Sequence, residues 1–80
     1  MSCSRTMLIS ARAEALFASP LPAGGQPTRA QVMDAIRLSV RAHRGVRGCA
    51  AEMAAVYGER PEVAAPRMRW AREVVTSIYS

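Results

Sequence analysis

The spacing of apolar positions along the chain predicts helices and no strands. Apolar side chains recur every three or four residues over long stretches rich in alanine, leucine, arginine, methionine and glutamate. This periodicity and this composition are typical of amphipathic helices. β-Branched residues never alternate with polar ones over a convincing run. The expected fold class is therefore all-α, a small bundle of about four helices in a single domain covering residues 1–80.

The first predicted helix covers residues 4–18. Its apolar side chains gather on adjoining faces, whereas Arg12 and Glu14 point elsewhere. The helix should end where Ser19 meets Pro20. The stretch "SPLPAGGQP" has three prolines and two glycines in nine residues, which is typical of a connector. We therefore expect residues 1–19 to form a separable helix, residues 20–27 a connector, and residues 28–80 a helix-turn-helix-like core.

The second predicted helix begins at Thr28. The Thr28 hydroxyl can cap the first turn, and Gln31, three residues on, can reach back to the Thr28 amide in a capping box. Gly45 is the expected C-terminal cap. The apolar row of this helix contains Val32, Ile36 and Val40, flanked by Met33 and Leu38.

Two further helices follow, and a proline lies inside the second. A short helix is expected from about Cys49 to Tyr57, and then a tight turn with positive φ at Gly58. The last helix starts at Pro61, which suits a first helical position. Pro66 removes a backbone hydrogen bond at a cost of about 3 kcal/mol, so we expect a kink or break there. The predicted buried face of the last helix contains Met68, Ala71, Val75 and Ile78.

The stretch from Glu52 to Val75 resembles the region-4 helix-turn-helix of sigma-70-type sigma factors and their response-regulator relatives. The matching positions are Met53, Ala54, Gly58, Arg67, Met68, Ala71, Arg72 and Glu73. The resemblance implies that Ala54 is small because the second helix crosses there, and that this second helix meets the DNA major groove. The whole chain also resembles short proteins of filamentous actinobacteria in stretches such as "ALFAS", "RGCA" and "RMRWAR", which implies no activity.

The chain departs from that helix-turn-helix pattern where bases would be contacted. Ala65 and Pro66 stand at the outward positions and offer bases only apolar contact. Glu59 and Arg60 replace the residues expected in and after the turn. We therefore expect mainly phosphate contacts. The candidate DNA-binding residues are Arg67, Arg69, Arg72, Arg60 and Arg47, and a second candidate phosphate stripe is formed by Arg37, Arg41 and Arg44.

The net charge is +5, and every basic residue is arginine. This charge favours DNA or an acidic protein as the partner. The single histidine, His43, and the two cysteines, Cys3 and Cys49, make neither a metal site nor a disulfide framework. Paired carboxylates, a phosphate loop and an activated nucleophile are also missing from the sequence, so we expect no enzyme and no cofactor. No stretch reads as a membrane span, and a cytoplasmic location is expected.

Two functions remain in view. The first is a small DNA-binding, transcription-associated regulator. The alternative is a non-enzymatic protein-interaction module that has lost base readout and that pairs with transcription machinery or with a second copy of itself. A single helix-turn-helix covers only half of a two-fold site, so the first helix is the natural place for a homodimer contact. The interface candidates are Trp70, Leu8, Ile9, Leu16 and Phe17.

Overall fold

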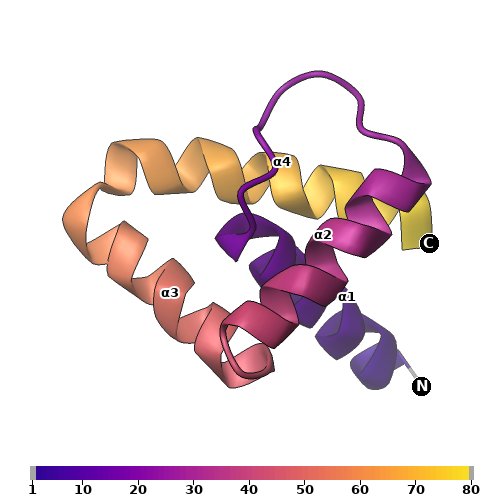
Figure 1. The fold of residues 1–80 in the computed structure, drawn as a ribbon, viewed down its shortest axis with the longest axis horizontal. Coiled ribbons are helices and arrows are strands. Elements are labelled where there is room, and N and C mark those ends of the chain that lie inside the picture. The colour runs from indigo at the N-terminus through magenta and orange to yellow at the C-terminus, as the bar shows by residue number, and fades with distance from the viewer. Residues whose placement is uncertain (1, 80) are drawn as a thin grey trace.

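The protein is an all-α bundle of four helices, as the sequence predicts. The computed structural model describes the backbone of residues 2–79 and the side chains of residues 8–79. The helices are α1 (Ser2–Ala18), α2 (Arg29–Ala42), α3 (Val46–Glu59) and α4 (Pro61–Tyr79), joined by a connector at residues 19–28 and by two short links (Figure 1). No strand occurs within residues 2–79.

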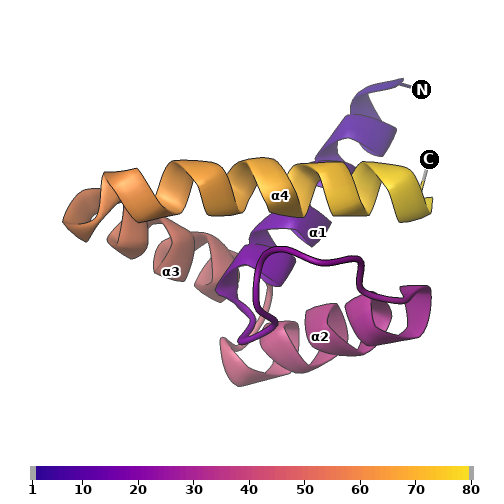
Figure 2. The same cartoon turned by 90° about the horizontal axis from the view of Figure 1, so that it is seen from above.

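Helix α1 is the centre of the bundle. It packs against each of the other three helices, and in the view of Figure 2 it crosses α4 and its C-terminal part lies between α4 and α2. The expectation that residues 1–19 stand apart from a 28–80 core is therefore wrong. The physical reason is that the chain has few large apolar side chains, so those of α1 are needed to form the core. The hydrophobic core contains Ala13, Leu16 and Phe17 from α1, Val32 from α2, and Ala64, Ala71 and Val75 from α4.

The ends of α2 are set by local hydrogen bonds. The predicted capping box is confirmed: the Gln31 amide donates to Thr28 Oγ1 at 3.1 Å, and the Thr28 amide donates to Gln31 Oε1 at 2.8 Å. The C-terminal end differs by one residue from the expectation, because the left-handed residue after the helix is Arg44, with φ of 62°. The Gly45 amide then donates to the Val40 carbonyl at 2.7 Å, as in a Schellman motif.

The link between α3 and α4 is tighter than a helix-turn-helix turn. Gly58 lies inside α3, and its φ is not positive, so the predicted turn at Gly58 is wrong. Arg60 alone separates the two helices, with φ of −142° and ψ of 70°. A helix-turn-helix turn has about three to four residues. Glycine is tolerated within a helix, and Pro61 fixes the start of α4 only two residues after α3 ends.

Helix α4 is not broken at Pro66. It runs as one helix from Pro61 to Tyr79, and its ribbon is continuous in Figures 1 and 2. Pro66 and Glu62 are both exposed, so the Glu62 carbonyl that loses its partner can be hydrated. The burial of Ala64 and Ala71 against the core stabilises the helix on both sides of the proline.

The small residues that lie where helices pack closely are not the ones that the sequence predicts. Ala54, predicted to lie beneath the crossing helix, is exposed. Ala64 and Ala71 are instead fully buried in the core. Gly48, in the first turn of α3, also approaches the end of α2 closely, because an added Cβ would overlap the His43 carbonyl group. Only glycine fits there without a shift of the α2–α3 link.

Candidate nucleic-acid interface

Arg67, the first candidate for DNA contact, points into the molecule. Its Nε donates to the Phe17 carbonyl at 2.9 Å, and its Nη2 donates to the carbonyls of Ser19 at 2.7 Å and Leu21 at 2.9 Å. The guanidinium thus caps the C-terminus of α1 and holds the start of the connector. Burial lowers the pKa of this guanidinium, although arginine stays protonated in proteins. Arg67 is therefore not available to a phosphate in this fold.

Two other arginines also make contacts between helices, both with the end of α4. The Arg29 Nη1 donates to the Ile78 carbonyl at 3.0 Å, near the end of α4. The Arg12 guanidinium lies 4.0 Å from the centre of the Tyr79 ring, a cation–π contact. Local sequence patterns do not distinguish these structural arginines from the surface ones, because the carbonyls and rings that they contact lie far away along the chain.

The outward face of α4 keeps two of the predicted DNA-contacting residues. Arg69 and Arg72 are exposed, and neither makes an ion pair or hydrogen bond among residues 8–79. Glu62 and Glu73 are exposed on the same helix. The two carboxylates reduce the positive charge that Arg69 and Arg72 present to a nucleic acid.

Arg60 lies at the corner between α3 and α4. Its Nε is 3.9 Å from a Glu62 carboxylate oxygen, and both side chains are 70% exposed. An exposed pair at this distance contributes little to stability. Arg60 is accessible, but its charge is partly neutralised by Glu62.

A group of exposed arginines lies at residues 41–47, which we call the α2–α3 corner. Arg41, Arg44 and Arg47 are all exposed, and none of them makes an ion pair or hydrogen bond through its side chain among residues 8–79. No acidic residue occurs in the corner. Arg37 of the predicted stripe is different, because its Nη2 pairs with Asp34 at 2.7 Å.

The backbone of the corner adds to this positive field. Helix α3 begins there, its N-cap residue Gly45 provides no side-chain cap, and no acidic residue occupies the first turn. The first amides of a helix carry partial positive charge. The predicted stripe is not continuous along α2, since Arg44 lies beyond the end of the helix in a left-handed conformation. The structure instead combines Arg41 and Arg44 with Arg47, which the sequence analysis had assigned to a separate group.

The interface candidates divide into buried and exposed residues. Leu16 and Phe17 are core residues, so their assignment to a partner contact is wrong for this fold. Leu8 is 53% exposed, and Ile9 is half-buried against the core. Trp70 is also half-buried, with Arg67 5.1 Å from its ring. Only Leu8 among these five offers a largely exposed side chain.

One small polar network lies beneath the corner. His43 Nδ1 donates to the Ser39 carbonyl at 2.9 Å, and the Ser39 hydroxyl lies 3.7 Å from Cys49 Sγ. Cys49 is fully buried, so its thiol is closed to solvent. The contacts tie the end of α2 to α3, which is a structural role.

Comparison with known proteins finds no matching family model, no matching curated protein and no matching solved structure. Among the helices of the described residues, none is both long and apolar enough to cross a membrane. Residues 8–79 contain no group of three or more histidine, cysteine or acidic side chains placed to hold a metal ion. The function is thus argued from the residues of this chain alone.

Proposed function

We propose that the protein binds nucleic acid through its phosphate backbone at the α2–α3 corner. The observation that carries this proposal is the presence of three exposed arginines, Arg41, Arg44 and Arg47, within seven residues that contain no acidic side chain. Guanidinium groups bind phosphates with charge-assisted hydrogen bonds. Contacts of this kind position a protein on a duplex without reading its sequence.

The corner supports this proposal better than α4 does. A reading helix would place Arg69 and Arg72 in the major groove together with Glu62 and Glu73, and the two carboxylates would meet the phosphate charge. The side chain of Arg67, which the sequence pattern assigned to the same helix face, is occupied by backbone carbonyls. The proposed role in transcription rests only on the expected partner, which is a nucleic-acid duplex.

The test is the salt dependence of binding to a labelled mixed-sequence duplex, followed by fluorescence anisotropy. Three phosphate contacts predict a log–log slope of about −2.7. Replacing Arg41, Arg44 and Arg47 together by glutamine should remove most of the slope and the affinity. The matched control replaces Arg69 and Arg72 by glutamine and should leave the slope nearly unchanged. The opposite pattern, with loss only in the control, would assign binding to α4 and overturn the corner.

An acidic protein is the second candidate partner, and one feature of the corner favours it. Val46 is 45% exposed between the arginines, and an apolar side chain flanked by guanidiniums fits a protein surface better than a phosphate backbone. The Val46→Ser variant separates the two partners. If phosphates alone are bound, the Val46→Ser variant should bind the duplex with the affinity of the parent protein. If the parent protein binds no duplex even at low salt, the protein partner is favoured.

A further inference from the structure

The indole of Trp70 holds a polar atom without a partner. Its Nε1 is buried, and no hydrogen-bond acceptor in the described residues reaches it. Most buried polar side-chain atoms in proteins have a partner, so an exception requires an explanation such as a bound water or ligand. An indole nitrogen can only donate, and the missing group must therefore be an acceptor.

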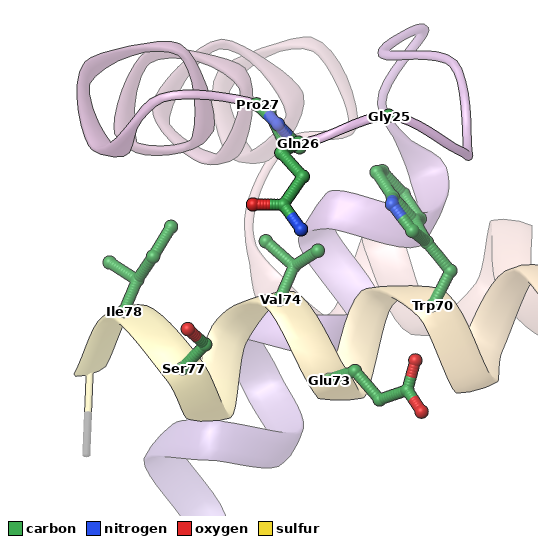
Figure 3. Close-up of a pocket in the computed structure, with 8 residues that line it drawn as sticks. All are labelled: Gly25, Gln26, Pro27, Trp70, Glu73, Val74, Ser77 and Ile78. Carbon is green, nitrogen blue, oxygen red and sulfur yellow. The ribbon is translucent and has the colours of Figure 1, made fainter.

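This indole lines a cleft between the connector and α4. The cleft has a volume of about 250 Å³, and Figure 3 shows Trp70, Val74 and Ile78 projecting from α4 towards the connector. Benzene fits an apolar cavity of about 150 Å³, and drug-sized ligands occupy about 300–1,000 Å³. The cleft is thus suited to a molecule somewhat larger than benzene.

The remaining lining residues supply polar groups around this apolar surface. Gln26 reaches from the connector towards Val74 (Figure 3), and its carboxamide makes no hydrogen bond within residues 8–79. Gly24 and Gly25 precede it with positive φ and no neighbour within 4 Å of an added Cβ. The Gln26 side chain is exposed and no hydrogen bond within residues 8–79 holds it, so it can turn to admit a ligand to the indole nitrogen.

The indole itself is held in place before any ligand binds. The Arg67 guanidinium lies 5.1 Å from its ring centre and is fixed by hydrogen bonds to the end of α1. A preorganised donor loses little conformational freedom on binding. Glu73 also lines the cleft, although Figure 3 shows its carboxylate pointing away from the connector, and its negative charge disfavours an anionic ligand.

From these features we propose that the cleft binds a small uncharged amide or lactam with an apolar body. The ligand carbonyl accepts the Trp70 Nε1 hydrogen bond, and the apolar body covers Val74 and Ile78. The ligand N–H donates to the Gln26 carboxamide oxygen. A charged ligand would have to be desolvated against the two aliphatic side chains, which is costly. This site is separate from the α2–α3 corner and does not depend on its proposed role.

The experiment is an NMR titration of the ¹⁵N-labelled full chain with N-cyclohexylacetamide. The protein contains one tryptophan, so one indole N–H resonance reports on the site. We expect a saturable downfield shift of this proton at about millimolar ligand, as for other small fragments. Cyclohexylammonium has the same ring without the carbonyl acceptor and should leave the indole proton unmoved.

Two variants at one exposed position complete the test. Ser77→Phe should fill the cleft and weaken binding at least tenfold, whereas Ser77→Ala should bind as the parent protein does. The amide spectra of both variants away from the cleft verify that they fold. The proposal is overturned by a non-saturable response, by an equal indole shift with cyclohexylammonium, or by unchanged affinity in Ser77→Phe. A long-lived water at the indole that the ligand cannot displace would also overturn it.

Discussion

At the scale of single residues, two glycines in α3 have opposite roles. A Cβ at Gly48 would overlap the carbonyl of His43, whereas a Cβ at Gly58 would meet nothing within 4 Å. We predict that Gly48→Ala lowers the free energy of unfolding by about 1–3 kcal/mol through overpacking. Gly58→Ala should raise it by about 1 kcal/mol, because alanine is the better helix former.

Urea denaturation of the two variants measures both effects against the same parent protein. The pair is matched because both glycines lie in one helix and receive the same methyl group. A loss of stability in Gly58→Ala would mean that Gly58 requires a positive φ, as the helix-turn-helix resemblance implies. That result would contradict the single-residue link at Arg60.

Arg44 is a second residue whose backbone conformation decides the outcome of a substitution. It has φ of 62°, a conformation that costs a residue with a side chain about 1–2 kcal/mol. Arg44→Gly should therefore stabilise the fold, by about 1 kcal/mol after the entropy lost by glycine is counted. Arg41→Gly within α2 should destabilise by about 1 kcal/mol. Thermal unfolding followed by circular dichroism gives the sign of both changes.

At the scale of helices, Arg67 joins α4 to the end of α1. Arg67→Met removes the guanidinium and leaves the carbonyls of Phe17, Ser19 and Leu21 without this donor. Hydrogen bonds from a charged group contribute about 1.5–3 kcal/mol, and several are lost together, so we expect a destabilisation of about 2–4 kcal/mol. The control Arg69→Met, on the exposed face of α4, should change stability by less than about 0.5 kcal/mol. Equal denaturation midpoints for the two variants would contradict the capping role.

The sequence predicted features set by neighbouring residues better than it predicted contacts between helices. Thr28 and Gln31 form the expected capping box because all of its atoms come from four consecutive residues. Pro61 likewise begins α4 as expected. The effect of Pro66 could not be predicted from the sequence, because its cost depends on whether the Glu62 carbonyl can be hydrated, which is a property of the packed helix. The partners of Arg67 lie about 50 positions earlier in the chain, so local patterns could not indicate them.

At the scale of the whole molecule, the candidate interface was only partly predictable for the same reason. Charge and composition predicted a basic surface. They could not show which arginines are used to close the bundle, since Arg12, Arg29 and Arg67 differ from Arg41 and Arg47 only in what the fold brings near them. In the predicted stripe, Arg37 is paired with Asp34 whereas Arg41 and Arg44 are not. In the predicted reading helix, Arg67 contacts backbone carbonyls whereas Arg69 and Arg72 are exposed. The exposed arginines of the α2–α3 corner differ from the others in having no acidic residue within their segment.

The central position of α1 leads to a prediction about the stability of the whole chain. Leu16 is fully buried, whereas Leu8 on the same helix is 53% exposed. A domain of this size buries only about 60% of its unfolded surface, so the loss of one large core side chain is felt throughout the molecule. Leu16→Ala should lower the free energy of unfolding by about 2–5 kcal/mol, and Leu8→Ala by less than about 0.5 kcal/mol.

Urea denaturation at two protein concentrations measures both variants and also tests the expected homodimer. If α1 paired with a second copy through its exposed side, the denaturation midpoint of the parent protein would rise with concentration. Leu8→Ala would then destabilise nearly as much as Leu16→Ala. A midpoint independent of concentration, together with a large effect at Leu16 alone, would establish that α1 stabilises its own chain from within the core. The homodimer contact at α1 would then be excluded, because Leu16 and Phe17 pack within the core and the exposed Leu8 would contribute nothing to stability.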